Sequence, residues 1–245
     1  MKNIFVVAAV LLTATAQLQA QITITPAKKM IARQYLQSEV NRYELSMQKN
    51  GQRIVRAVLE DAITLMPAKN QLLRVQTLLV KGKPMSIDSV LVTLDAFQPI
   101  YHAGTNPRRS VQLKYDYALG KIIGQYTPKR QVKKQAKTHI IQQQVPAPYF
   151  DSNVYEMMLR FLPLKTGLKA KFPAYAYESA QRNGVRWYEI QEVALQKFNQ
   201  QACFVVKVKN EQRQIVYYWI NQQNRTLYKY EIHLPNGRKV LFTKV

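Results

Sequence analysis

The chain has 245 residues, of which 47% are hydrophobic and 10% aromatic, and 36 Lys and Arg against 14 Asp and Glu give it a net charge of +22. This apolar content is enough for a sizeable core and excludes a largely disordered protein. The charge attracts polyanions at low salt, although a generally solvated basic surface accounts for it equally well.

The N-terminus has the layout of a secretory signal peptide. Lys2 precedes an apolar run from Ile4 to Leu12, and small residues follow in TATAQLQA. The run is too short to span a bilayer comfortably, and this order of charge, apolar core and small residues is typical of a cleaved leader. We expect cleavage after Ala20, or after Ala16, and export to the periplasm or outer-membrane periphery of a Gram-negative bacterium. A buried N-terminal strand is the alternative.

With residues 1–20 removed as a signal peptide, residues 21–245 are expected to fold as a single mainly β domain. Apolar and polar residues alternate in three segments, as in strands with one buried face. These segments are 43–48, 111–117 and 226–234. Asn-Gly dipeptides, which favour tight antiparallel hairpins, occur at 50–51, 183–184 and 236–237. The run 215–220 is apolar on both faces, which predicts a strand covered on each side.

The segment 149–167, YFDSNVYEMMLRFLPLKTG, is the one stretch with a helical pattern. At about 100° per residue, its apolar side chains between 154 and 162 cover an arc of about 200°. Glu156 and Arg160 lie outside this arc, four residues apart, and are expected to pair along an exposed edge. A helix this apolar would leave much of its surface in water on a flat sheet. We therefore expect a strongly curved antiparallel sheet, a half-barrel, whose concavity receives one principal helix from Ser152 to Leu162.

A basic segment from Thr127 to Pro148 separates two β-rich halves. It has five Lys and Arg, no acid, and proline near both ends. This composition is typical of an exposed crossover or linker. Its cations are either simply solvated or form a strap that contacts an anionic membrane surface. They are Lys129, Arg130, Lys133, Lys134 and Lys137.

The sequence lacks the motifs of familiar catalytic sites. There is no G-x-S-x-G, no H-E-x-x-H, no P-loop and no paired C-x-x-C. The three histidines, His102, His139 and His233, are far apart along the chain, so we expect neither a metal site nor a cofactor. Cys203 has no partner for an internal disulfide and is expected to be a buried core residue. We therefore predict a protein that is not an enzyme and, after export, has no nucleic-acid partner.

The block 151–167, followed by WYEIQEV, CFVVKV and YYWINQQNRTLYKYEIHLPNGRKVLF, resembles an uncharacterised family of exported bacterial proteins of unknown function. Those proteins are similar to the curved, helix-plugged β half-barrels of the periplasmic lipoprotein carriers. The resemblance covers mainly Phe150 to Phe242. It implies the fold more than an activity, because no position matches a carrier's ligand-contact motif. The lipid-anchoring cysteine of membrane-anchored carriers is also missing.

We predict noncatalytic binding of a lipid or other amphiphile, free or attached to a lipoprotein, in the bacterial envelope. Methionines are flexible fillers suited to an adaptable pocket wall. The predicted apolar groove consists of Tyr155, Met157, Met158, Phe161 and Trp219. The first alternative is an envelope interaction or scaffold protein with a filled core and a basic docking surface. A hydrolase is the third possibility, and the oligomeric state is left open.

Overall fold

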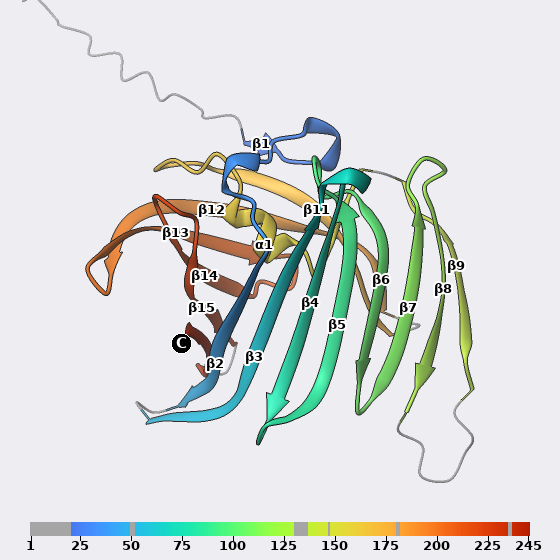
Figure 1. Cartoon of the computed structure of the whole chain (residues 1–245), viewed down its shortest axis with the longest axis horizontal. Coiled ribbons are helices and arrows are strands. Elements are labelled where there is room, and N and C mark those ends of the chain that lie inside the picture. Colours follow the sequence, from blue (N-terminus) through green and yellow to red (C-terminus); the bar gives the residue numbers. More distant parts are fainter. Residues whose placement is uncertain (1–20, 50–51, 130–136, 147, 180–181, 235–236) are drawn as a thin grey trace, which may run out of the picture.

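The computed structural model describes residues 21–49, 52–129, 137–146, 148–179, 182–234 and 237–245. They form a mainly β structure with one large, mixed, mostly antiparallel sheet and one short α-helix (Figure 1). The predicted signal peptide lies outside the described residues.

The sheet has 16 strands across the described residues. Their bounds are β1 (Ile22–Thr23), β2 (Glu39–Lys49), β3 (Gln52–Met66), β4 (Gln71–Val80), β5 (Lys83–Thr93), β6 (Pro99–Asn106), β7 (Arg109–Asp116), β8 (Lys121–Pro128), β9 (His139–Gln144), β10 (Phe150–Asp151), β11 (Ala170–Ser179), β12 (Arg182–Phe198), β13 (Gln201–Asn210), β14 (Ile215–Asn221), β15 (Leu227–His233) and β16 (Lys239–Lys244). The helices are α1 (Tyr155–Arg160) and the 3-10 turns η1 (Pro26–Lys28), η2 (Arg33–Tyr35) and η3 (Pro67–Lys69).

The C-terminal strand lies in the middle of the sheet and joins its two halves. β16 pairs antiparallel with β2, and Phe242 lies opposite Leu45 in this pairing. Strands β3 to β9 follow β2 in sequence order, whereas β15 to β11 follow β16 in reverse order. The short strands β1 and β10 pair parallel with β11. The two ends of the strand order are therefore β1 and β9.

The helix α1 is shorter than the predicted Ser152–Leu162 and is covered on two sides. Met157, Met158 and Leu159 are each at most 1% exposed. They share one core with side chains from both halves of the sheet, including Leu59, Leu72, Val206 and Tyr218. In Figure 1, α1 lies between strands β2 to β5 and the strands that follow β11. The apolar arc of the helix is thus fully used in packing.

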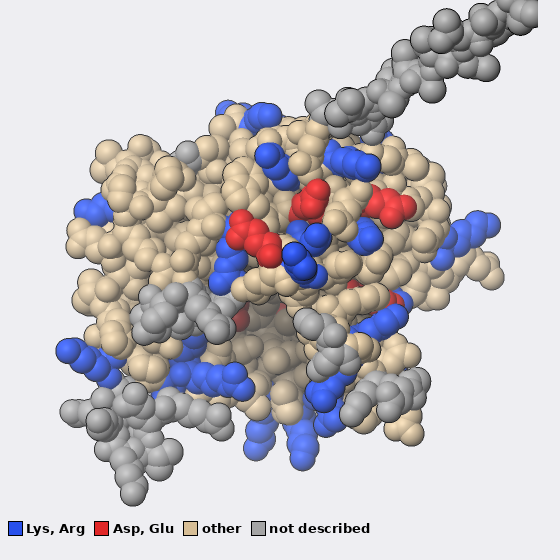
Figure 2. All heavy atoms as spheres, turned by 180° about the vertical axis from the view of Figure 1, so that it is seen from behind, with Lys and Arg blue, Asp and Glu red and all other residues tan. Residues whose placement is uncertain are grey.

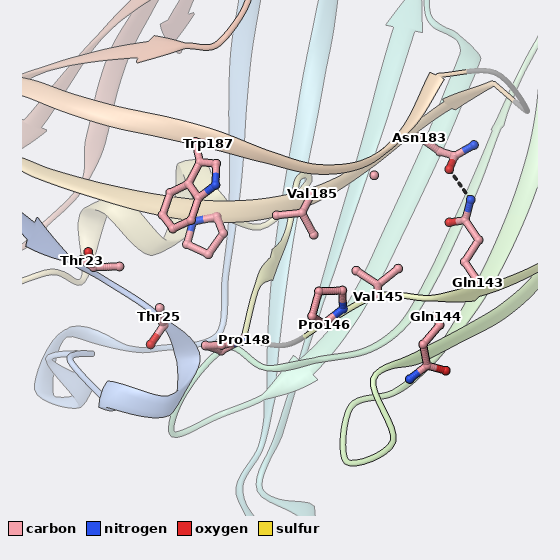
Figure 3. Close-up of a pocket in the computed structure, with 12 residues that line it drawn as sticks. Thr23, Thr25, Gln143, Gln144, Val145, Pro146, Pro148, Asn183, Val185 and Trp187 are labelled. Carbon is pink, nitrogen blue, oxygen red and sulfur yellow. Dashed lines mark hydrogen bonds between the residues drawn. The ribbon is translucent and has the colours of Figure 1, made fainter.

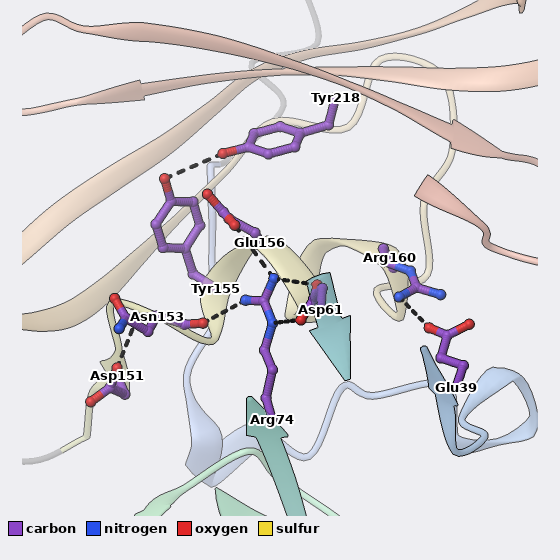
Figure 4. Close-up of polar contacts among 9 residues, drawn as sticks. All are labelled: Glu39, Asp61, Arg74, Asp151, Asn153, Tyr155, Glu156, Arg160 and Tyr218. Carbon is purple, nitrogen blue, oxygen red and sulfur yellow. Dashed lines mark hydrogen bonds and ion pairs between the residues drawn. The ribbon is translucent and has the colours of Figure 1, made fainter. Parts of the chain in front are cut away.

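The predicted Glu156–Arg160 pair is wrong (Figure 4). Arg160 is buried, and its Nη1 lies 2.6 Å from Oε1 of Glu39, while its Nε donates to the carbonyl oxygen of Arg225 at 2.8 Å. Glu156 instead lies beside Arg74, with 3.5 Å between Oε2 and Nη2. Since sheet strands cover both flanks of the helix, neither side chain has the solvent-exposed edge that the pairing required.

The alternating segments are confirmed as strands, and so is the buried position of Cys203. In β7, Val111, Leu113 and Tyr115 are buried, as the sequence pattern predicts. In β14, however, the second face is only half covered. Val216, Tyr218 and Ile220 are buried, but the intervening Tyr217 and Trp219 are half-buried. The predicted cover on each side of this strand is therefore only partial on the second face.

Two loop predictions differ from the structure. Asn183-Gly184 lies inside β12, where Asn183 pairs with Tyr177 and the preceding Arg182 already pairs with Ser179. The segment 127–148 contains β9, which pairs antiparallel with β8. Ile141 of β9 is buried in a second core cluster, whereas Ile140 is exposed, so one buried apolar side chain joins to the core a strand that the composition did not indicate.

Candidate functional site

A buried charged network holds the start of α1 against the sheet. His102 on β6 places Nδ1 2.9 Å from Oδ2 of Asp151, and the hydroxyl of Tyr115 on β7 donates to the same oxygen at 2.5 Å. The backbone N–H of Asn153 donates to Oδ1 of Asp151 at 2.7 Å. Asp151 therefore ties the segment before the helix to two neighbouring strands.

His102 and Asp151 form an ion pair. Burial alone would lower the pKa of His102, but Asp151, and more weakly Asp88, raises it to about 10. Burial alone would raise the pKa of Asp151, but the charge of His102 holds it below its usual value. Both side chains are buried, so the pair serves as a structural anchor.

A second buried pair, from β3 and β4 of the same half of the sheet, fixes the same segment (Figure 4). Arg74 on β4 makes a bidentate contact with Asp61 on β3, with N–O distances of 2.8 and 2.7 Å. It also donates to the carbonyl oxygen of Asn153. Bidentate guanidinium–carboxylate contacts are among the strongest and most directional in proteins. These contacts leave the start of α1 little freedom to move.

The structure does not bring the five predicted groove residues together. Met157, Met158 and Phe161 fill the core, each at most 1% exposed, and the ring of Tyr155 packs 4.6 Å from that of Tyr188. Trp219 lies on the other face of β14, where Nζ of Lys229 is 4.5 Å from its ring centroid. Space that could hold a ligand therefore has to be sought away from α1.

Such space occurs where β9 lies opposite β12, a region that we call the seam (Figure 3). A groove of about 810 Å³ opens there, within the size range of ligand pockets. The side-chain amide of Gln143 on β9 donates to that of Asn183 on β12 across the gap. The groove is lined by Thr23, Thr25, Gln143, Gln144, Val145, Pro146, Pro148, Pro173, Asn183, Gly184, Val185 and Trp187.

A charged pocket adjoins this seam groove. It has a volume of about 480 Å³, and Trp187, 41% exposed, lines both spaces. Nζ of Lys171 lies 5.3 Å from the centroid of the Trp187 ring, and the Trp187 backbone N–H donates to Oε1 of Glu211 at 3.0 Å. The lining consists of Gln21, Lys171, Trp187, Tyr188, Glu189, Lys209, Asn210, Glu211 and Arg213. Three cations thus face two carboxylates beside an indole ring.

Sequence reasoning missed the seam because its residues come from distant segments. Thr23, Val145 and Trp187 are brought together only by the pairing of β1 with β11 and by the return of β9 toward β12. The local signals were a proline pair after three glutamines, at 146 and 148, and a tryptophan on the solvent face of a strand. Neither of these signals shows which distant segment lies next to it in the fold.

The predicted basic strap is only partly within the described residues. Lys129 and Lys137 are exposed, and Nζ of Lys129 donates to the hydroxyl of Thr105 at 2.5 Å. Arg130, Lys133 and Lys134 lie outside the part of the chain that the structure describes. Figure 2 shows Lys and Arg spread over one face of the molecule around a hollow, with Asp and Glu among them. On this face the charge does not gather into one patch.

Among the described residues, no group of three or more His, Cys, Asp and Glu is arranged to hold a metal ion. Their helices include none with the length and apolar character needed to cross a membrane.

Comparison with solved structures gives distant similarities. A crystal structure of a β-barrel-like protein of domain of unknown function DUF1849 from Brucella abortus is 8% identical, with a TM-score of 0.49 over 91% of this chain and 97% of that chain. A LolA superfamily protein from Nitrosomonas europaea is 10% identical, with a TM-score of 0.23 over 91% and 92%. A DUF1329 family protein from Desulfovibrio piger is 7% identical, with a TM-score of 0.27 over 90% and 88%. Similarities this weak say nothing about what this chain binds.

No curated protein matches the chain. A family model described as a protein of unknown function, DUF3108, matches residues 42–243. This span includes the seam strands β9 and β12, α1 and both buried ion pairs. The resemblance to an uncharacterised family is therefore confirmed, and the chain belongs to the DUF3108 family of proteins of unknown function.

Proposed function

We propose that this protein is an exported, noncatalytic binding protein for an amphiphile in the bacterial envelope. Its sheet acts as a half-barrel whose concave side is plugged by α1, and the ligand lies at the seam. The observation that carries the proposal is Trp187, which lines an apolar groove on one side and a charged pocket on the other. An amphiphile likewise has an apolar part next to a charged or polar part.

The seam groove suits an acyl chain. Val145, Pro146, Pro148, Pro173 and Val185 give it an apolar lining that is already open. Each methylene removed from water contributes about 0.8 kcal/mol, so an acyl chain in the groove would supply a large part of the binding free energy. Entry also requires no unpacking of α1, because no residue of the helix lines the groove.

The charged pocket suits an anionic head. Lys171, Lys209 and Arg213 outnumber Glu189 and Glu211, which leaves a formal excess of one positive charge. Ammonium and guanidinium groups bind phosphate and carboxylate oxygens through charge-assisted hydrogen bonds. Tryptophan is well suited to the boundary, since its ring is apolar and its N–H can reach a polar group. We therefore favour a phospholipid-like or lysophospholipid-like ligand.

The test uses the mature chain with lysophosphatidylglycerol, and with glycerol phosphate as the probe that lacks an acyl chain. We expect native mass spectrometry to show one lysolipid per chain and the Trp187 indole resonance to shift, whereas glycerol phosphate binds much more weakly. Val185→Phe, which fills the groove, should abolish binding. Its matched control is Ile140→Phe, on β9 but outside the groove and 76% exposed, which should bind normally.

Equal lysolipid binding by Val185→Phe and the parent would contradict the proposal, as would binding by neither. The second result would favour the scaffold alternative, in which exposed cations such as Lys129 and Lys137 contact an anionic surface. Binding of the parent to anionic vesicles should then weaken steeply with salt, because surface charges are screened within about 10 Å at 0.1 M.

A further inference from the structure

A separate pocket lies on the outer face of the sheet, where the proposed function has no use for it. It spans β12 to β15 and has a volume of about 240 Å³. Its β14 residues, Tyr217 and Trp219, alternate with the core residue Tyr218, so the pocket is on the face opposite α1. The lining consists of Glu192, Ala194, Gln196, Val205, Lys207, Tyr217, Trp219, Glu231 and His233.

Small side chains beside aromatic ones create this pocket. Ala194 lies opposite Val205, and Val205 lies opposite Trp219 on the next strand. The rings of Tyr217 and Trp219 are 6.3 Å apart, and the imidazole of His233 is 4.9 Å from the Tyr217 ring. The result is a short aromatic wall above an aliphatic floor.

Hydrogen-bonding groups surround that wall. Glu192, Gln196 and Lys207 offer both acceptors and donors at the rim. Glu231 is held in place, since its Oε2 lies 3.1 Å from Nε2 of His233 and its Oε1 contacts Lys229. The lining itself has two carboxylates and one lysine, and Lys229 and Lys239 lie against Glu231 from outside it. Glu231 is thus already paired, and the pocket presents mixed donors and acceptors rather than charge of one sign.

We propose that this outer pocket binds a neutral saccharide unit. A sugar ring is apolar on its C–H faces and polar at its hydroxyl edge, which matches an aromatic wall with mixed donors and acceptors around it. The volume is below the roughly 300–1,000 Å³ of pockets for drug-sized ligands, so the occupant is a single ring of a glycan. A protein with both sites would hold an amphiphile at the seam and a glycan on its outer face.

The chain contains two tryptophans, Trp187 and Trp219, so their indole N–H resonances report on the two sites separately. The probes are N-acetylglucosamine, glucose and maltose, with inorganic phosphate as the anionic comparison. We expect at least one of the sugars to shift the Trp219 resonance and leave that of Trp187 unchanged. Phosphate should not shift the Trp219 resonance.

Two variants make the test specific. Ala194→Leu fills the floor of the pocket but keeps the aromatic wall, and it should weaken sugar binding about tenfold or more, which corresponds to about 1.4 kcal/mol. Trp219→Ala should do the same, whereas Trp187→Ala should bind sugar normally and lose the lysolipid. The proposal fails if no sugar of the panel shifts the Trp219 resonance, if phosphate alone does so, or if Ala194→Leu binds sugar like the parent. None of these results depends on whether the seam binds lysolipid.

Discussion

The interior around α1 and the seam groove are both rich in apolar side chains, but they use them differently. Around α1, Met157 and Met158 are fully buried, and Arg74 makes two hydrogen bonds to Asp61. At the seam, Val185 and Trp187 border a groove of about 810 Å³. Apolar side chains are closely packed and stabilise the fold around α1, whereas at the seam they line an open groove.

The reason for the difference lies in the sheet. Near α1 the strands β2 to β5 and β12 to β16 have hydrogen-bonded partners on both sides, and both halves of the sheet pack against the helix. The strand order ends at β1 and β9, and the Gln143–Asn183 side-chain contact spans the remaining gap. The groove therefore lies where backbone pairing stops, whereas α1 packs against side chains from both halves of the sheet.

Arg74 provides the largest expected effect on the packed interior. Arg74→Met leaves the buried carboxylate of Asp61 and the half-buried carboxylate of Glu156 without their cation, and breaking a buried pair in this way costs about 3–5 kcal/mol. Chemical denaturation should show this fall in the free energy of unfolding. The matched control is Arg42→Met, which removes an exposed contact to Glu60 and should cost about 0–1 kcal/mol.

If Arg74→Met lowers the free energy of unfolding no more than Arg42→Met does, this ion pair does not stabilise the interior. The contrast with the seam is then weaker than we infer. Adding Asp61→Leu to Arg74→Met should recover part of the stability, because the largest uncompensated charge is then gone.

The next largest effect is expected from the His102–Asp151 pair, which should make the free energy of unfolding depend on pH. The folded pKa of His102 is about 10 against an ordinary 6.5, so its contribution is complete below pH 6.5 and is lost as the pH rises through 10. Between these values the folded chain holds one more proton, and the free energy of unfolding should fall by about 1.4 kcal/mol per pH unit. Asp151 acts at the other end: its lowered pKa gives a contribution that is lost as the pH falls below about 4.

The measurement is the slope of unfolding free energy between about pH 7 and 9 for the parent and for His102→Gln. The variant should lose this part of the slope, even though it is less stable at every pH. His233→Gln is the matched control, since that histidine is on the outer face. An unchanged slope in His102→Gln would show that the pair is not ionised in the folded protein.

The sequence predicts much of the fold and little of the site. Alternation in 111–117 and the apolar arc of 154–162 identify strands and helix, because burial on one face leaves a local period. The Arg160–Glu39 contact and the Gln143–Asn183 contact join residues 121 and 40 positions apart, and no local period records such pairings. The predicted groove includes Trp219, which lies on the outer face, because the run 215–220 is apolar on both faces and alternation alone does not distinguish inside from outside.

Met158→Trp gives the smallest expected effect and decides most directly whether the two regions differ. Met158 is fully buried beside Phe161, and enlarging a side chain in a close-packed core costs about 1–3 kcal/mol. The seam counterpart, Val185→Trp, has open space beside it and should leave the free energy of unfolding almost unchanged. A carrier whose helix yields to ligand would behave in the opposite way: Met158→Trp would keep its stability and lose lysolipid uptake. That outcome, from thermal unfolding and native mass spectrometry of the same samples, would move the binding site from the seam to the helix.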